Sequence, residues 1–413
     1  MKARASISGF CPGALRPMAA RDGLLVRIRP RLSRLSLAQL AAVTEAAAEF
    51  GNGSFTLTSR ANIQIRGVSA AAHARMVEVL ARADLVDEDA AVEAVRNVVV
   101  GPDIALGVSS VAALGLDLAG KIEEGLRTSA RLRELPGKFG VSIMNGDGSD
   151  SSASGDATFF VGEAGIRLVL DGDANGCALF SNVDAATAGF QAVASEFLRL
   201  RKIFPEIRRL RQAVRLAGSE ALLRAASPAA TEHAPPAALL SPPVGLRGAS
   251  FGIGFVFGEI GPGAARAVLR FMKRHGIGET AVSPGRTLVF PCREGTEADF
   301  RELARAVEGI VTSSDFRLRV HACAGAPFCA SGEAASRRDA GRLLDALQQP
   351  RGFAGAIHVS GCAKKCAHPA DAEIAAIASG GAYTILLRGE PRFAGVAPDA
   401  MPKAIAACVE EFA

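Results

Sequence analysis

The sequence has 413 residues, of which 49% are apolar, and a formal net charge of +5. This length and apolar content are enough to bury a sizeable core, so the sequence predicts a globular protein and not a disordered one. The basic residues are scattered, and with one Tyr and no Trp there are few platforms for base stacking. We therefore expect an anionic small-molecule ligand and no nucleic acid.

The N-terminal stretch MKARASISGFCPGALRP (residues 1–17) lacks the apolar core of a signal peptide. No run of about 18 apolar residues, the length needed to span a membrane, occurs in the sequence. We expect a cytoplasmic protein with no membrane contact. Because the cytoplasm is reducing, clustered cysteines in such a protein are better candidates for metal binding than for disulfides.

Two segments, residues 36–67 and 261–290, share the pattern of a helix followed by a strand. In each, apolar residues at helical spacing end at a glycine, Gly51 or Gly276, and a strand-like run follows. The offset in residue number that takes Gly51 to Gly276 also aligns residues 95–104 with 320–329 and residues 154–160 with 379–385. Together these matches predict an internal duplication.

Four cysteines form two pairs, with five residues between Cys323 and Cys329 and three between Cys362 and Cys366. These spacers are wider than the two-residue spacers that wrap two sulfurs around one zinc ion, and they suit the separated corners of a 4Fe-4S cluster. A structural zinc site and four unrelated core cysteines are the alternatives. The isolated cysteines are expected to be small buried apolar residues: Cys11, Cys177, Cys292 and Cys408.

The constant offset of the repeat also relates charged residues to thiols. It aligns Arg96 with His321, which is close to Cys323 in the sequence, and Lys138 with Ala363, which is next to Cys362. If the two halves face one another, cations on one wall would oppose a metal centre on the other, and a ligand between them would be anionic.

The spacing of the four cysteines resembles that of the sulfite and nitrite reductase superfamily, in which a C-x5-C-xn-C-x3-C motif holds a 4Fe-4S cluster beside a tetrapyrrole. LTSRANIQIRG (57–67) resembles the signature strand of the family, with Arg60 at the position that contacts tetrapyrrole carboxylates. The segments RNV (96–98) and LPGKF (135–139) resemble two others that supply an arginine and a lysine. The tetrapyrrole-binding residues predicted in this way are Arg60, Asn62, Arg66, Arg96 and Lys138, and the cluster ligands are Cys323, Cys329, Cys362 and Cys366.

Arginines suit such a ligand because planar guanidinium groups bind carboxylates through two hydrogen bonds. We expect Arg60, Asn62 and Arg66 to project from one face of a single strand, because side chains two residues apart share a face. Arg27 and Arg29 are further candidates.

Two branches of the superfamily are candidates for this sequence. Siroheme-dependent sulfite or nitrite reductases carry two lysines in LPRKFK-like segments, whereas LPGKFG here keeps Lys138 and has Gly140 at the second position. Reduction of an oxyanion needs that concentrated positive charge, so its loss argues against a reductase. The opening GFCPGALRPMAARDGLLVRIRP (9–30) instead resembles the precorrin-3B synthases.

This second resemblance implies a monooxygenase of aerobic cobalamin (vitamin B12) biosynthesis. Such an enzyme hydroxylates precorrin-3A at C20 with O2, and an acetate side chain closes a γ-lactone. The implied cofactors are a 4Fe-4S cluster and a mononuclear non-haem iron; siroheme belongs only to the alternative, a sulfite or nitrite reductase. The residues near the cluster loops that could bind the iron, His321, His368 and Asp371, give no clear ligand set, so no iron ligand and no catalytic residue is assigned.

No nicotinamide- or flavin-binding motif is evident, so we expect an external electron donor, NADH through a reductase or a ferredoxin-like protein. The exposed basic residues expected at Lys364 and Lys365 could dock an acidic donor, or could simply belong to a solvated loop.

The expected fold is α+β, a duplicated nitrite/sulfite reductase-like fold with two pseudo-two-fold related repeats of antiparallel or mixed sheets flanked by helices. The Pro- and Ala-rich stretch near the middle of the chain is typical of a linker. The predicted divisions are ferredoxin-like half-domains at 1–75 and 245–300, α/β lobes at 76–224 and 301–413, and a linker at 225–244. We expect the half-domains to pair and the lobes to enclose the substrate.

Overall fold

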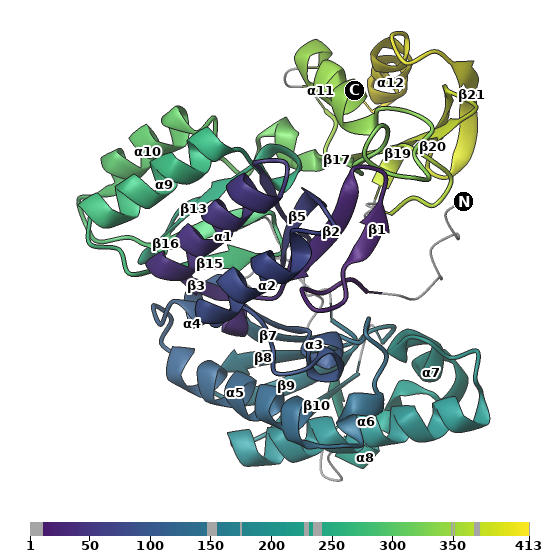
Figure 1. Cartoon of the computed structure of the whole chain (residues 1–413). Coiled ribbons are helices and arrows are strands. Elements are labelled where there is room, and N and C mark those ends of the chain that lie inside the picture. Colours follow the sequence, from purple (N-terminus) through teal and green to yellow (C-terminus); the bar gives the residue numbers. More distant parts are fainter. Residues whose placement is uncertain are drawn as a thin grey trace.

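The computed structural model describes residues 11–146, 155–173, 176–226, 231–233, 242–347, 350, 352–366 and 372–412. Four sheets, each with helices packed against it, make up this part of the chain. Figure 1 shows two of the sheets in the middle of the molecule, with one lobe below them and the other at the upper right. The predicted α+β architecture is confirmed.

The first central sheet has the strand order β1-β2-β5-β4-β14. Its strands are β1 Met18–Ala20, β2 Gly23–Ile28, β5 Ile63–Val68, β4 Phe55–Leu57 and β14 Glu259–Ile260. Its helices are α1 Leu37–Phe50 and α2 His73–Arg82. Helix α1 begins at a capping box, in which Ser36 and Gln39 each accept a hydrogen bond from the backbone N–H of the other.

The second central sheet has the order β12-β13-β16-β15-β3. Its strands are β12 Gly245–Arg247, β13 Ser250–Gly254, β16 Thr287–Pro291, β15 Glu279–Ser283 and β3 Arg34–Ser36. Its helices are α9 Pro262–Arg274 and α10 Glu297–Ala306. Each central sheet therefore takes its last strand, β14 or β3, from the other half of the chain. One continuous apolar core joins both sheets, so the two halves are packed as a unit.

The duplication is visible in the backbone of these two sheets. The short helices η1 Arg31–Ser33 and η3 Val256–Gly258 are related by the offset seen in the sequence, and Leu32 and Phe257 within them share a positive φ of 51° and 54°. Ala61 and Arg286, at the turns that precede β5 and β16, share a positive φ of 52° and 60°. Non-glycine residues seldom adopt this conformation, so its recurrence at both positions is strong evidence for a repeat.

The lobes repeat a second topology. In the first lobe the sheet order is β11-β10-β9-β8-β7-β6, and in the second it is β17-β18-β19-β20-β21. In each lobe the first three strands in the chain are parallel and the following ones antiparallel. The strands are β6 Val98–Val100, β7 Val141–Asn145, β8 Ala157–Gly162, β9 Gly165–Leu170, β10 Gly176–Phe180, β11 Thr231–His233, β17 Val320–Ala322, β18 Ala356–Ser360, β19 Ala372–Ser379, β20 Ala382–Leu387 and β21 Glu390–Val396.

Helices cover the lobe sheets and form a separate apolar core in each lobe. In the first lobe they are α3 Ala90–Val95, α4 Pro102–Ala105, α5 Ala112–Thr128, η2 Leu132–Glu134, α6 Val183–Ile203, α7 Leu210–Ala217 and α8 Ser219–Ala226. In the second lobe they are η4 Phe316–Arg319, α11 Ser336–Ala346 and α12 Met401–Glu410. The domain boundaries expected from the sequence stay predictions.

The prediction of one constant offset is wrong in the lobes. In the first of the two aligned segments residues 157–160 belong to β8, the third strand of the first lobe, but residues 379–385 lead into β20, the fourth strand of the second. The true counterpart of β8 is β19. The offset changes because α4, α5 and η2 lie between β6 and β7, whereas in the described residues α11 is the one helix between β17 and β18. Lys138 consequently precedes β7, while Cys362 follows β18, and the two are not equivalent.

Tyr383, the only tyrosine of the chain, is fully buried in the core of the second lobe. Its hydroxyl donates a hydrogen bond of 2.9 Å to Asp339, a fully buried carboxylate. We expect Tyr383→Phe to lower the free energy of unfolding by about 1–3 kcal/mol, because it leaves one oxygen of Asp339 short of a donor. Chemical denaturation followed by circular dichroism measures this loss, and an unchanged midpoint would contradict it.

No helix in the described part of the chain is long and apolar enough to cross a membrane.

Candidate functional site

A shallow, open hollow lies where the turn between β4 and β5 meets the N-terminal ends of β6, β7 and β8. It is lined by Arg60, Asn62, Asn97, Val98, Val99, Gly140, Val141, Ser142 and Gly155. We call it the Arg60 hollow. It brings together two predicted ligand-binding residues, Arg60 and Asn62, with Gly140, where the motif resemblance predicts the loss of a second lysine.

The turn that carries Arg60 is held by Thr58, whose hydroxyl accepts hydrogen bonds from the backbone N–H of Arg60 (3.3 Å) and of Asn62 (3.1 Å). The prediction of a single strand through residues 57–67 is wrong, because β4 ends at Leu57 and β5 begins at Ile63. Arg60 therefore lies at the hollow, whereas Arg66 lies far along β5. The positive φ of Ala61 makes the turn, and periodicity alone does not reveal it.

Arg60 is partly buried and reaches the predicted lysine segment, donating a hydrogen bond of 3.4 Å to the backbone carbonyl of Lys138. The Lys138 side chain is exposed. Burial, and next the positive charge of Arg209, lower the pKa of Arg60. Arg60 thus stands among other cations in a partly dehydrated place, where an anionic group would relieve the repulsion.

Arg209 carries no sequence signal for a role at this site. It binds Asp156 through two hydrogen bonds of 3.0 Å each, and Asp156, which is fully buried, also accepts from the backbone N–H of Gly140 (3.0 Å). This carboxylate therefore fixes both a cation near Arg60 and the glycine that lines the hollow.

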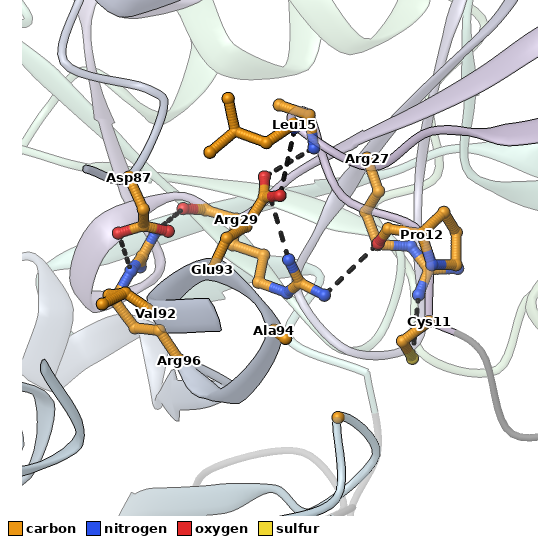
Figure 2. Close-up of polar contacts among 12 residues, drawn as sticks. Cys11, Pro12, Leu15, Arg27, Arg29, Asp87, Val92, Glu93, Ala94 and Arg96 are labelled. Atoms are coloured by element: carbon orange, nitrogen blue, oxygen red, sulfur yellow. Dashed lines mark hydrogen bonds and ion pairs between the residues drawn. The ribbon is translucent and has the colours of Figure 1, made fainter. Parts of the chain in front are cut away.

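Arg96 has other partners than those predicted (Figure 2). Its Nε and Nη2 donate to the two carboxylate oxygens of Asp87 at 2.7 and 2.9 Å, and Nη2 also donates to the carbonyl of Arg29 at 2.9 Å. Its Nη1 lies 3.6 Å from Glu123. Arg96 is 4% exposed, so in this structure it holds the first lobe together and does not face the hollow.

Arg29 and Glu93 form a second buried pair beside Arg96 (Figure 2). Glu93 accepts hydrogen bonds from the backbone N–H of Ala14 (2.5 Å) and Leu15 (3.1 Å), and its carboxylate lies 4.0 Å from Nη1 of Arg29. A Cβ at Gly13 would overlap a carboxylate oxygen of Glu93, so a larger residue there would displace this carboxylate. The start of the described chain is thereby anchored to α3.

Arg27 also contacts this anchored N-terminal segment, through the backbone carbonyl of Gly13. Its Nη1 lies 3.7 Å from the Cys11 sulfur, and Arg29 donates from Nε to the side chain of Asn97, a residue of the hollow, at 3.1 Å. Besides burial, the positive charge of Arg27 contributes to the lowered pKa of Arg60. Cys11 is partly exposed, so the expectation of a buried cysteine is wrong at this position.

Arg66 also has partners within the protein. It donates to both carboxylate oxygens of Asp22 (3.1 and 3.0 Å) and to the backbone carbonyl of Phe328 (2.8 Å). Phe328 belongs to the segment that joins Cys323 to Cys329. The residue predicted to bind a tetrapyrrole therefore contacts the cysteine loop.

The four clustered cysteines lie on two loops that follow β17 and β18. The backbone N–H of Gly361 donates to the Cys323 sulfur (3.2 Å), and that of Glu333 donates to the carbonyl of Gly361 (2.7 Å). A Cβ at Gly361 would lie 2.9 Å from Cα of Gly325, so the loops can pack this closely only because glycines meet.

The other three clustered thiols affect Cys366 electrostatically. Burial raises the pKa of Cys366, and the charges of Cys323, Cys362 and Cys329 raise it further. Cys362 is buried, Cys366 is exposed, and the other two are intermediate. Among the described residues, no three His, Cys, Asp or Glu side chains converge tightly enough to hold a single metal ion.

The candidate iron ligands remain unassigned. His321 and His358 are paired in register on the parallel strands β17 and β18, so their side chains share a face of the sheet. His368 and Asp371 lie outside the described residues.

Comparison with known proteins defines the class of fold. Residues 16–83 match the nitrite/sulfite reductase ferredoxin-like half domain. The NirA protein of Mycobacterium tuberculosis superimposes with a TM-score of 0.72 at 19% identity, over 94% of this chain and 80% of that chain. The chain has a nitrite/sulfite reductase-like fold, as predicted.

A more specific likeness comes from sequence. The chain is 26% identical over 391 residues to a protein of Sinorhizobium sp named precorrin-3B synthase, covering 92% of this chain and 83% of that protein. The predicted resemblance to the precorrin-3B synthases is confirmed. The matching family model and this relative both carry the names of enzymes.

Proposed function

We propose that this protein is a precorrin-3B synthase, which uses O2 to hydroxylate precorrin-3A at C20 with formation of a γ-lactone, in aerobic cobalamin biosynthesis. The observation that carries the proposal is the composition of the Arg60 hollow. It places a partly buried arginine and an asparagine beside Gly140, in a chain that resembles a precorrin-3B synthase along most of its length.

In this proposal the side chains of the hollow bind the anionic tetrapyrrole. Arg60 and the exposed Lys138 pair with its peripheral carboxylates, and Asn62 donates from its amide. Arg209 adds positive charge nearby, although Asp156 neutralises it in part. Arg66 and Arg96, also predicted to bind the ligand, would first have to exchange Asp22 or Asp87 for it, so the main binding role passes to Arg60 and Lys138.

Gly140 is the reason for preferring this activity to that of a siroheme reductase. Its backbone lines the hollow and its N–H is held by Asp156, so the place where the reductases have a second lysine carries no cation of its own. A large organic anion needs charges spread around its rim, whereas sulfite or nitrite needs them concentrated at one point.

The four cysteines fit a 4Fe-4S cluster. Their wide spacing in the sequence and their position on two adjacent loops favour ligands at the corners of a cluster over ligands around a single zinc ion. The N–H of Gly361 already points to a thiol sulfur, and such hydrogen bonds stabilise bound thiolates. When bound, the cluster would supply single-electron transfer.

We further propose that O2 is the second substrate and that electrons come from a separate donor, either NADH through a reductase or a ferredoxin-like protein. Cys366, Lys364 and Lys365 are exposed together on one cysteine loop, which would let an acidic donor approach the cluster. A mononuclear non-haem iron remains part of the proposal without assigned ligands, and we propose a cytoplasmic location.

An absorption spectrum and an acid-labile sulfide assay of anaerobically purified protein test the cofactor. Labile sulfide with an iron–sulfur shoulder and no haem band is the expected result. A strong haem-like spectrum would assign the protein to the siroheme reductases, and zinc without labile sulfide would contradict both assignments.

Arg60→Ala tests the ligand site. Loss of a charge-assisted hydrogen bond costs about 1.5–3 kcal/mol, so we expect the tetrapyrrole to bind roughly 10- to 100-fold more weakly. Arg208→Ala is the matched control, because Arg208 is exposed and lies outside the hollow. Equal affinities of the two variants, measured by fluorescence quenching of the tetrapyrrole, would refute the assignment of Arg60.

A further inference from the structure

The cysteine loop of the second lobe is attached to the first half of the chain at one carbonyl group. The carbonyl oxygen of Phe328, the residue before Cys329, accepts hydrogen bonds from Nη2 of Arg66 (2.8 Å) and from the backbone N–H of Arg21 (3.1 Å). Arg21 lies in the turn between β1 and β2, and Arg66 lies on β5. Two adjacent pieces of one sheet thus hold the same point of a loop that is remote in sequence.

The orientation of Arg66 is fixed by a carboxylate. Asp22, beside Arg21, accepts from Nε and Nη2 of Arg66 at 3.1 and 3.0 Å, and only 10% of the Arg66 side chain and 15% of the Asp22 side chain are exposed. Binding through Nε and one N–H of Nη2 fixes the plane of the guanidinium, and the second N–H of Nη2 donates to Phe328. A lysine could make one of these contacts but not all three.

The second half of the chain holds the same segment from its other end. Arg286 donates from Nη2 to the carbonyl of Leu318 (2.8 Å) and from Nη1 to that of Val320 (3.3 Å), just before β17 leads to Cys323. The segment is therefore fixed near Cys323 by the second central sheet and near Cys329 by the first.

We propose that Arg66 is a positioning residue, which locks the Cys329 loop to the sheet that carries the ligand-binding turn. Arg60 precedes β5 and Arg66 lies within it, so one short strand links the proposed tetrapyrrole site to a proposed cluster ligand. Arg66 acts through the position of Cys329 and does not itself contact the substrate. The inference rests on the proposed function for its meaning, but the contact itself can be tested without the cofactor.

Hydrogen exchange measured by mass spectrometry on the metal-free chain is the first test. In Arg66→Ala we expect the amides of residues 325–332 to exchange about tenfold faster, because the loop loses a charge-assisted hydrogen bond. Arg66→Lys should restore part of the protection. The exchange rate of the loop in Asp22→Asn should lie between the rates in Arg66→Lys and in the wild type. Arg75→Ala, a change at an exposed arginine paired with Glu49, should leave the loop unchanged.

The spectroscopic signature of the reduced cluster is the second test. We expect the electron paramagnetic resonance signal to broaden or shift in Arg66→Ala, to return toward the wild-type signal in Arg66→Lys, and to stay unchanged in Arg75→Ala. Asp22→Asn provides a milder perturbation in case Arg66→Ala does not fold.

The outcomes separate the two proposals. Loop exchange within twofold of the wild type in both Arg66→Ala and Asp22→Asn overturns the positioning role, whatever the cofactor. If the wild-type protein binds no cluster, the proposed function fails, and the exchange experiment still decides whether Arg66 fixes the loop. Faster loop exchange with an altered signal supports the positioning role.

Discussion

Replacing Cys362 by alanine should remove the proposed cluster. Cys362 is buried and follows Gly361, whose N–H donates to the Cys323 sulfur, so it lies where the two cysteine loops meet. We expect iron and labile sulfide to fall to background, and turnover to fall by more than about 100-fold, since loss of a mere partner of a metal ligand already costs 10- to 100-fold. Metal analysis and a turnover assay measure both quantities.

Cys177→Ala is the matched control for this change. Cys177 is as well buried as Cys362 but lies on β10 in the other lobe. This variant should keep its iron, its sulfide and its activity. Retention of the full iron and sulfide content by Cys362→Ala would remove Cys362 from the set of ligands.

The second large effect is expected at Glu93, which is 4% exposed. Glu93→Ala would leave a buried arginine, Arg29, without its carboxylate and would free the N–H groups of Ala14 and Leu15. Removal of one member of a buried ion pair costs about 3–5 kcal/mol, and we expect a loss of stability of this size. Thermal or denaturant unfolding gives the measurement.

Two variants separate charge from packing in this experiment. Glu93→Gln keeps an acceptor for the backbone and should lose less stability than Glu93→Ala. Glu124→Ala removes an exposed carboxylate of α5 that pairs with Arg127, and it should have no measurable effect. If Glu93→Ala were as stable as Glu124→Ala, the buried network would not anchor the N-terminal segment.

The duplication could be predicted from sequence because short helices with glycine stops leave a periodic pattern. That pattern is strict in the central sheets, where even the positive φ of Leu32 recurs at Phe257. It could not be extended to the lobes, because connections between strands change length without changing topology. The exchange of β3 and β14 between the sheets was not predictable either, since strand pairing over such distances depends on the whole packed core.

The partners of the arginines were equally hard to predict from the sequence. Arg60 contacts the backbone of Lys138 in the structure, but an arginine in a motif can equally satisfy a buried aspartate. The pairing of Arg96 with Asp87 and of Arg66 with Asp22 depends on the tertiary fold. Arg209 was missed for the same reason, since Asp156 brings it to the site from the start of α7.

Conversion of the proposed substrate tests the central claim most directly. Anaerobically purified protein, an electron donor and precorrin-3A would be exposed to isotopically labelled dioxygen, and the product analysed by mass spectrometry. The account predicts a lactone product with one labelled oxygen atom, formed by the wild type and lost in Cys362→Ala. Unchanged precorrin-3A, together with reduction of sulfite or nitrite by the same preparation, would contradict it.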